Sequence, residues 1–214
     1  MNLDLYVITD EALAGGLPHA VIAKRAVDGG ATAIQLRDKG RSYRDLVLIG
    51  REIHAITRKA GALFIVNDRL DIAFACGADG VHLGQGDLRC DTVRQLAPPG
   101  FIIGISVGSV EDAVDAERAG ADYVALSPIF STNSKEDAGP GHGLLLLKKI
   151  RAVVSIPVIA IGGIGPGNAG SVIGAGADGI AVISAVVSQP DITAAARRLA
   201  GIVARQKRNP RRKR

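Results

Sequence analysis

The feature of the sequence that most constrains the fold is a short phrase that occurs four times. It reads GATAIQL from Gly30, GADGVHL from Gly77, GADYVAL from Gly120 and GADGIAV from Gly176. A Gly suits the left-handed position just after a helix C-terminus, and the apolar run that follows has the length of a strand. Each copy, called here a repeat phrase, therefore predicts a turn from a helix into a strand.

Further apolar runs lie before and between the repeat phrases. They read LDLYVIT, GALFIVND, GFIIGIS and SIPVIAIGG, which brings the strand candidates to eight. Amphipathic segments separate them, for example at 43–60, 110–119 and 144–152. Strict alternation of strand and helix implies parallel strands with right-handed crossovers. The sequence thus predicts an α/β fold, a parallel eight-stranded (β/α)8 TIM barrel, with a doubly wound open sheet as the alternative.

The composition agrees with a parallel sheet that is buried on both faces. Hydrophobic residues make up 47% of the 214 residues and aromatic residues only 3%, so the core must be aliphatic. Two cysteines, Cys76 and Cys90, are too few for a disulfide framework. The N-terminus does not read as a secretory signal, and no apolar run reaches the ~18 residues of a membrane span. We therefore expect a cytoplasmic protein that does not bind a membrane.

Basic residues gather at the C-terminus. The last ten residues, RQKRNPRRKR, contain seven Lys or Arg and no acid, so the net charge of +5 is largely a property of this segment. We expect one barrel domain over residues 1–204 and a basic tail at 205–214 that is solvated and disordered. Contact of the tail with nucleic acid is the less favoured alternative.

The polar residues that could bind a ligand or take part in catalysis lie at the ends of the apolar runs. These ends read QLRDK, VND, HLGQGD, GIS, SPIFSTNSK, AIGGIGPGN and VIS. In a barrel the C-terminal ends of all strands lie on one face, and active sites are built there. We therefore expect these scattered residues to converge on one rim.

Cations and glycines on this rim indicate two phosphate sites. Arg37 and Lys39 alternate in the extended direction, and Lys135 adds a third cation on a polar loop. A guanidinium fork and compact ammonium groups together suit a polyphosphate. Gly162 and Gly163 follow the seventh strand, where barrels frequently bind a phosphate monoester.

Two carboxylates end neighbouring strands. Asp68 follows the third strand and Asp87 the fourth. Mg²⁺ takes one or two carboxylates and completes its shell with water and substrate phosphate, so the pair predicts a Mg²⁺ site. The alternative is an N-cap role, since each Asp precedes a plausible helix.

The histidines carry less information. His19, His54 and His142 lack a motif and are expected at the surface. His82 aligns with Gln35 in the repeat phrases, so it is either a core histidine or a lumen residue near the site.

Assembled, these motifs resemble the thiamine-phosphate synthase family. The resemblance covers residues 5–200 and rests on YVITD, QLRDK, NDRLDIA, GADGVHLGQGD, GADYVALSPIFSTNSK, IPVIAIGGI and GADGIAVIS. It implies a Mg²⁺-dependent transferase that joins 4-amino-2-methyl-5-hydroxymethylpyrimidine diphosphate to 4-methyl-5-(2-phosphoethyl)thiazole. The products would be thiamine monophosphate and diphosphate, formed by dissociative alkyl transfer.

The resemblance also assigns residues to the two substrates. It implies catalytic roles for Arg37, Lys39, Ser106 and Lys135, and metal binding by Asp68 and Asp87. The implied pyrimidine diphosphate site comprises Gln35, Leu36, Arg37, Asp38, Lys39, Asn67, Ser106 and Lys135. The implied thiazole phosphate site comprises Thr132, Asn133, Ser134, Gly163, Ile183 and Ser184.

One position departs from the family pattern. Many members have a His two residues after Ser106, where this chain has Gly108. A thiazole tautomerase-like paralogue, which uses a His in this region and tends to lose the diphosphate and metal residues, is the first alternative. A nonenzymatic binder acting through the basic tail is the second. We expect phosphorylated small molecules as partners and no nucleic acid, and the sequence leaves a homo-oligomer open.

Overall fold

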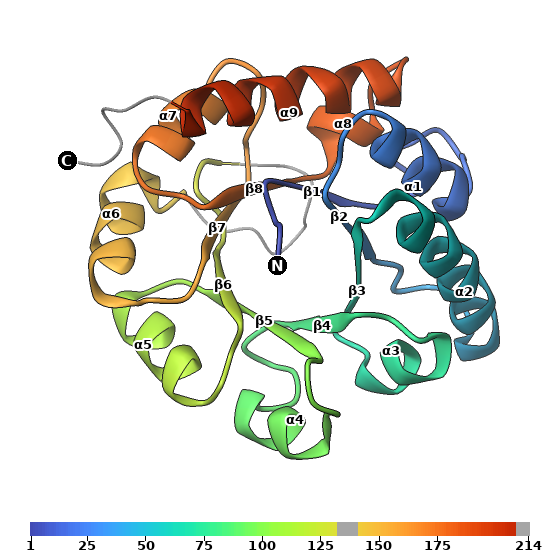
Figure 1. Ribbon diagram of the computed structural model, residues 1–214, viewed down its shortest axis with the longest axis horizontal. Helices are drawn as coiled ribbons and strands as arrows, with labels where there is room; N and C mark the ends of the chain where they lie inside the picture. The colour runs from blue at the N-terminus through green and yellow to red at the C-terminus, as the bar shows by residue number, and fades with distance from the viewer. Residues whose placement is uncertain (132–140, 209–214) are drawn as a thin grey trace.

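A computed structural model describes residues 1–131 and 141–208 of the chain. It shows a closed barrel of eight parallel strands inside a ring of helices (Figure 1). Each strand pairs in parallel with the next along the chain, and β1 pairs with β8 to close the barrel. The predicted TIM barrel is confirmed, and the open sheet is not formed.

The strands are short and the helices differ widely in length. The strands are β1 Leu5–Ile8, β2 Ala33–Leu36, β3 Leu63–Asn67, β4 Gly80–Leu83, β5 Ile102–Val107, β6 Tyr123–Leu126, β7 Val158–Ile161 and β8 Gly179–Val182. The helices are α1 His19–Asp28, α2 Tyr43–Ala60, α3 Leu70–Cys76, α4 Cys90–Leu96, α5 Val110–Arg118, α6 Gly143–Val153, α7 Ala169–Gly174, α8 Ser184–Val187 and α9 Ile192–Lys207.

The predicted helices agree closely with these bounds. The segment 43–60 is α2 in full, 110–119 is α5 with one residue less, and 144–152 is α6 with one residue more at each end. Helix α9 continues to Lys207, three residues into the segment predicted as tail. Residues 209–214 lie outside the described residues, so the division at residue 204 stays a prediction.

The repeat phrase has a specific structural cause. Its first Gly has a positive φ in all four copies, at 96°, 72°, 92° and 114°, as the left-handed position requires. Its third residue joins its own strand to the preceding one by a reciprocal pair of hydrogen bonds, called here a clasp. The four clasps tie β1 to β2, β3 to β4, β5 to β6, and β7 to β8.

The clasp on β3 and β4 illustrates the geometry. The amide of Asp79 donates to the carbonyl of Phe64 at 2.8 Å, and the Asp79 carboxylate accepts from the amide of Phe64 at 2.7 Å. Asp122 forms the same two bonds with Ile103, at 2.8 and 2.7 Å. The repeated Asp therefore pairs a backbone amide at the start of a strand that would otherwise be buried without a partner.

The remaining two clasps follow the same scheme. Asp178 donates to the carbonyl of Val158 at 2.7 Å and accepts from its amide at 3.0 Å. In the first copy Thr32 replaces Asp, and its hydroxyl oxygen accepts from the amide of Leu5 at 3.1 Å. The substitution of Thr for Asp at this position preserves the acceptor.

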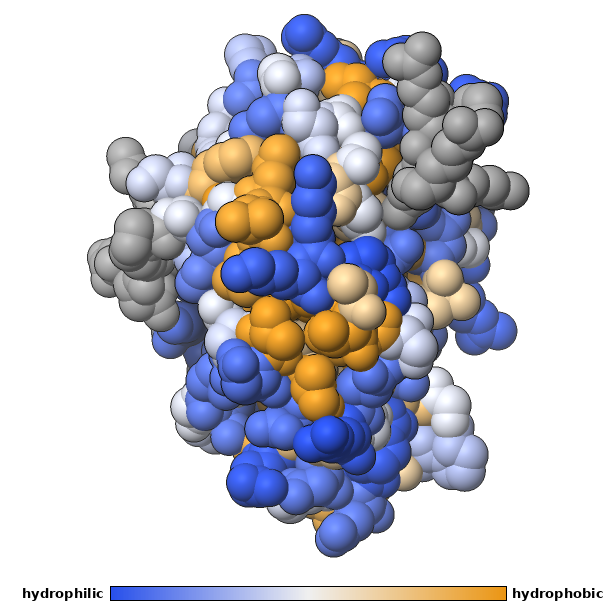
Figure 2. All heavy atoms as spheres, turned by 90° about the vertical axis from the view of Figure 1, so that its left-hand side faces the viewer, coloured by the Kyte–Doolittle hydropathy of each residue, from blue (hydrophilic) through white to orange (hydrophobic). Residues whose placement is uncertain are grey.

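The core is aliphatic, as the composition predicts, and the surface is mixed. All residues of β1, β2, β4, β6, β7 and β8 are buried. Figure 2 shows the side of the molecule on which α5 and α6 lie, where apolar side chains gather between charged ones. On α6, Leu145 is 68% exposed and Val153 51%. Among the described residues, the helices are all too short or too polar to cross a membrane.

The clasps yield a first prediction. Asp79→Ala should lower the free energy of unfolding by about 1–3 kcal/mol, because the amide of Phe64 loses its partner inside the fold. Asp79→Asn is the matched control, since its carbonyl oxygen can still accept that bond. Chemical denaturation of both variants is the measurement. Equal losses for Ala and Asn would show that the acceptor is not what matters.

Candidate active site

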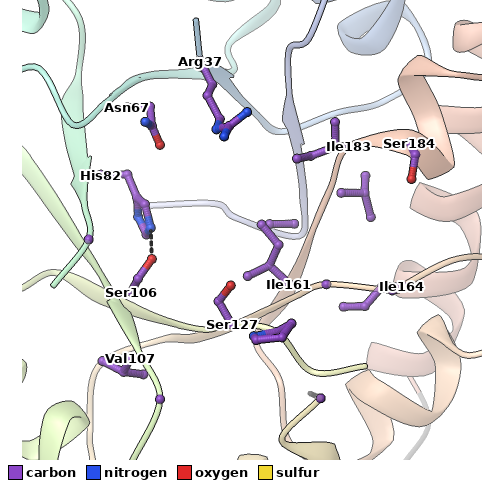
Figure 3. A pocket seen from close by; sticks show the side chains of 18 of the residues that line it. Arg37, Asn67, His82, Ser106, Val107, Ser127, Ile161, Ile164, Ile183 and Ser184 are labelled. Atoms are coloured by element: carbon purple, nitrogen blue, oxygen red, sulfur yellow. Dashed lines mark hydrogen bonds between the residues drawn. The ribbon is translucent and has the colours of Figure 1, made fainter. Parts of the chain in front are cut away.

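One large cavity opens at the C-terminal ends of the strands, with a volume of about 1040 Å³. Nine of the residues predicted for the site line it: Arg37, Lys39, Asn67, Asp68, Asp87, Ser106, Gly163, Ile183 and Ser184. Figure 3 shows Asn67 and His82 on one side of this cavity and Ile183 and Ser184 on the other. The predicted convergence on one rim is therefore observed for these nine.

Other predicted residues lie elsewhere. Gln35 and Leu36 are buried in β2 and do not line the cavity. Asp38 turns to a neighbouring cluster that is described below. Thr132, Asn133, Ser134 and Lys135 lie outside the described residues.

The two carboxylates predicted for a metal share one corner of the cavity. Asp68 is half-buried and hydrogen-bonded to Asp87, and burial followed by this neighbour raises the pKa of Asp68 to about 6. Lys39 opposes the shift, because its charge favours the ionised form. Asp68 also has a positive φ of 62°, a conformation that costs energy for a residue with a side chain. Two carboxylates this close suit a divalent cation.

The loop around Asp87 holds its carboxylate in place. One oxygen of Asp87 accepts from the amide of Gly84 at 2.7 Å. Gln85 donates from its side chain to the carbonyl of Ser106 at 2.6 Å, which ties this loop to β5. The N-cap residues are Arg69 for α3 and Arg89 for α4, so the alternative N-cap role of Asp68 or Asp87 is not formed.

The loop after β2 brings two cations to the cavity. Arg37 is partly buried and lies 3.8 Å from Asp10, while Lys39 is exposed. Between them, Asp38 points to His19 and accepts from the amides of Gly40 and Arg41 at 2.8 and 3.0 Å. The Asp38 side chain therefore fixes the loop that carries both cations.

The expectation that His19 is exposed is wrong. Its side chain is 1% exposed, with Nδ1 at 2.7 Å from the Thr9 hydroxyl and Nε2 at 3.1 Å from Asp38. Only the folded chain brings Thr9 and Asp38 to either side of the ring, so sequence context gave no signal. His54 is half-buried, and His142 is exposed as predicted.

Glu11, His19 and Asp38 stand close enough to hold a metal ion. Arg41, however, pairs with Glu11 at 2.5 Å and with Asp38 at 3.3 Å. Burial raises the pKa of both carboxyls, but hydrogen bonds outweigh it and hold both below their usual range. Glu11 accepts from the Arg41 side chain and the His19 amide, and Asp38 is hydrogen-bonded to the Gly40 amide, the His19 ring and the Arg41 amide. The guanidinium of Arg41 already supplies the positive charge that a metal ion would bring to this cluster. None of Glu11, His19 and Asp38 lines the cavity.

The opposite side of the cavity is built from backbone and apolar side chains. Gly162 and Gly163 have φ of 103° and 63°, and a Cβ on Gly163 would lie 2.7 Å from the carbonyl oxygen of Ser131. The loop therefore packs so closely that only glycine fits. Ile161, Ile164 and Ile183 add an apolar wall (Figure 3), of which only Ile183 was predicted for the site.

The side chain of His142 lies beside Gly108, the position at which the family pattern has a His. A Cβ on Gly108 would lie 3.5 Å from Nε2 of His142, and both residues line the cavity. His142 precedes α6, whereas Gly108 follows β5. An imidazole thus faces this part of the cavity even though the chain lacks a His on β5.

Comparison with known proteins points to a single family. A family model described as thiamine monophosphate synthase matches residues 5–186. The thiamine-phosphate synthase of Methanoregula boonei is 67% identical over 199 residues, covering 93% of this chain and 92% of that protein. The enzyme of Methanoculleus marisnigri is 59% identical over 207 residues, covering 97% and 98%.

Solved structures agree. The thiamine phosphate pyrophosphorylase of Pyrococcus furiosus superimposes with a TM-score of 0.88 at 44% identity, covering 95% of this chain and 96% of that one. 3-Hexulose-6-phosphate synthase, at 19% identity and a TM-score of 0.70, shares the fold.

The carboxylate pair yields a second prediction, for protein stripped of divalent cations. Because the folded state raises the pKa of Asp68 to about 6, the stability that Asp68 contributes is present below about pH 4 and is lost as pH rises through 6. Asp68→Asn stays uncharged and tolerates the positive φ. The variant should therefore exceed the original protein in stability by on the order of 1 kcal/mol at pH 7.5, with allowance for partial exposure.

Thermal melting of both proteins between pH 4 and 8 is the measurement. The gain in melting temperature should shrink as pH falls below 6. A gain that is the same at every pH would contradict a raised pKa at Asp68.

Proposed function

The chain belongs to the thiamine monophosphate synthase family, and from this premise we propose how its cavity divides the work between two phosphorylated substrates. Its activity is that of a thiamine-phosphate synthase, a transferase of thiamine biosynthesis. The observation that carries the proposed division is the position of the nine predicted residues around one cavity, with cations and carboxylates on one side and glycines and apolar residues on the other.

The pyrimidine diphosphate binds, in this proposal, on the side of β2, β3 and β5. Arg37 and Lys39 meet its phosphate oxygens, and Asn67 and Ser106 offer hydrogen bonds. Lys135, carried over from the family motif, adds a further cation from the segment outside the described residues. A diphosphate brings several negative charges, and fixed cations in a partly dry cavity stabilise them better than water does.

Asp68 and Asp87 would hold Mg²⁺ on the same side. The fit is supported by the donor set, since two carboxylates at hydrogen-bond distance stand beside the proposed diphosphate site. When bound, the ion would neutralise charge that builds up on the departing diphosphate. Burial and the neighbouring Asp87 raise the pKa of Asp68, and the ion would offset the repulsion from Asp87.

The thiazole phosphate binds, in this proposal, at the ends of β7 and β8. Gly163 lets the backbone approach an anion closely, and Ser184 at the start of α8 offers a hydroxyl. Thr132, Asn133 and Ser134, which come from the family motif, would complete the site. The apolar wall of Ile161, Ile164 and Ile183 is suited to the face of a heterocycle.

The proposed reaction is a dissociative transfer between these two sites. The bond from the pyrimidine methylene carbon to diphosphate oxygen breaks, and the electron pair leaves with the diphosphate. The thiazole nitrogen then supplies the pair for the new carbon–nitrogen bond. The work of the chain is to neutralise the leaving group and to hold both partners in line.

Several expectations remain predictions. The cytoplasmic location, the lack of nucleic-acid binding by the basic tail and a homo-oligomeric state belong to this group. A tautomerase role is less well supported, because Arg37, Lys39, Asp68 and Asp87 would serve no purpose without a diphosphate.

The decisive assay is direct. The purified chain, incubated with both substrates and Mg²⁺, should form thiamine monophosphate and diphosphate in equal amounts. Isomerisation of a thiazole phosphate, with no thiamine monophosphate formed from the two substrates, would instead support the tautomerase alternative.

The metal assignment gives the third prediction. Asp87→Asn should raise the Mg²⁺ concentration for half-maximal rate by at least about tenfold, because one charged ligand is lost. Asn keeps an oxygen for the amide of Gly84, so the loop should stay in place. Asp91→Asn, an exposed carboxylate paired with Arg89, is the control and should leave the Mg²⁺ dependence unchanged. A normal Mg²⁺ requirement in Asp87→Asn would remove this residue from the metal site.

The division of substrates gives the fourth prediction. Ser184→Ala should raise the KM for the thiazole phosphate about fivefold to tenfold with little change in kcat. That phosphate keeps its charge throughout the reaction, so its binding stabilises ground and transition states alike. Gly163 is a poorer probe, since any side chain there would strike Ser131. An increase confined to the KM for the pyrimidine diphosphate would reverse the assignment.

A further inference from the structure

A chain of hydrogen-bonded side chains crosses the barrel interior and ends at the cavity. Nε2 of Gln35 donates to the Tyr6 hydroxyl at 2.7 Å, and the Tyr6 and Tyr123 hydroxyls lie 3.2 Å apart. The Tyr123 hydroxyl is 3.0 Å from Nδ1 of His82, and Nε2 of His82 is 2.9 Å from the Ser106 hydroxyl. Figure 3 shows the last of these contacts at the cavity. The five residues come from five different strands.

The chain is built into the fold. Tyr6, Gln35 and Tyr123 are at most 1% exposed, and His82 is 8% exposed. The ring of Tyr123 stacks on His82, with centroids 5.6 Å apart at an interplanar angle of 21°. A Cβ on Gly104 would lie 2.0 Å from the Tyr123 ring, so the neighbouring strand leaves room for this ring only because it has a glycine there.

The direction of the hydrogen bonds follows from the donor at the start. Burial raises the pKa of Tyr6 and of Tyr123, so both phenols are neutral and each has one hydrogen to donate. Gln35 donates to Tyr6, and the Tyr123 oxygen is the remaining hydrogen-bond partner of the Tyr6 hydroxyl among the described residues, so we assign the Tyr6 hydrogen to Tyr123. Tyr123 in turn donates to Nδ1 of His82, which must therefore be unprotonated.

The last link reaches the cavity. With Nδ1 as an acceptor, a neutral His82 carries its proton on Nε2 and donates it to the Ser106 oxygen. Among the described residues, His82 is the only side chain hydrogen-bonded to that hydroxyl. The Ser106 hydrogen is then directed away from His82.

We propose that His82 is a positioning residue, fixed with its proton on Nε2 by Gln35, Tyr6 and Tyr123, that makes the Ser106 hydroxyl a hydrogen-bond donor to the substrate. The substrate atom that meets the Ser106 hydrogen must therefore be an acceptor, such as a ring nitrogen or a phosphate oxygen. This inference rests on the proposed function only for the identity of the substrate as the pyrimidine diphosphate.

The first test needs no catalysis. Nitrogen NMR of protein labelled with ¹⁵N-histidine reports which ring nitrogen carries the proton, and loss of one signal set in His82→Gln assigns His82 among the four histidines. We expect a proton on Nε2 and none on Nδ1 at neutral pH. A proton on Nδ1, alone or together with Nε2, would mean the reverse direction or an imidazolium and would overturn the proposal while leaving the proposed function intact.

The second test asks whether Tyr123 acts through Ser106. Ser106→Ala should lower kcat/KM for the pyrimidine diphosphate about tenfold, and Tyr123→Phe about threefold to tenfold. In the double variant the Tyr123 substitution should have no further effect, because the hydroxyl that it orients is gone. Tyr43→Phe, at a tyrosine that is 66% exposed, is the control and should leave kcat/KM unchanged.

Additive losses in the double variant would show that Tyr123 supports the fold alone and would overturn the proposal. Thermal melting of each variant separates such a loss of structure from a loss of orientation. Inactivity of the unmodified chain with both substrates would count against the proposed function, whereas the NMR result would still decide the proton position.

Discussion

The closed barrel depends on four reciprocal hydrogen-bond pairs at the starts of its strands. In each clasp one residue before an even-numbered strand binds both the amide and the carbonyl of one residue on the preceding strand, as Asp79 does with Phe64. A reciprocal pair fixes register as well as contact, since a slip of one residue would turn every side chain to the other face. With register fixed at the starts of the strands, the residues at their far ends meet at one level, and the cavity forms there.

The sequence predicts the fold well because the repeat phrase is local. The positive φ of its Gly and the length of its apolar run can be recognised in seven residues. The role of its Asp cannot, because the partner of Asp79 lies 15 positions earlier in the chain. Sequence reasoning therefore identified a turn at each phrase, and the structure adds that the turn also locks two strands together.

The site could be predicted in part for a similar reason. Arg37 and Asp68 come directly after a strand and Asp87 follows in the loop after β4, so the barrel topology alone places them on one rim. His19 has no such position, and its burial depends on Thr9 and Asp38, which approach from two loops. Contacts of this kind arise between segments, and one sequence without its fold contains no signal for them.

The barrel separates stability from chemistry along the direction of its strands. The clasps at the strand starts and the aliphatic core supply regular, fully paired structure. At the other end Asp68 has a positive φ and a raised pKa, two features that cost stability. The barrel tolerates these costs because its core and its clasps hold the ends of the strands firmly in place. The polar chain from Gln35 to Ser106 links the two regions, since it is packed like core and yet ends in a hydroxyl at the cavity. A rigid interior thus sets the direction of a single hydrogen bond at the proposed substrate site.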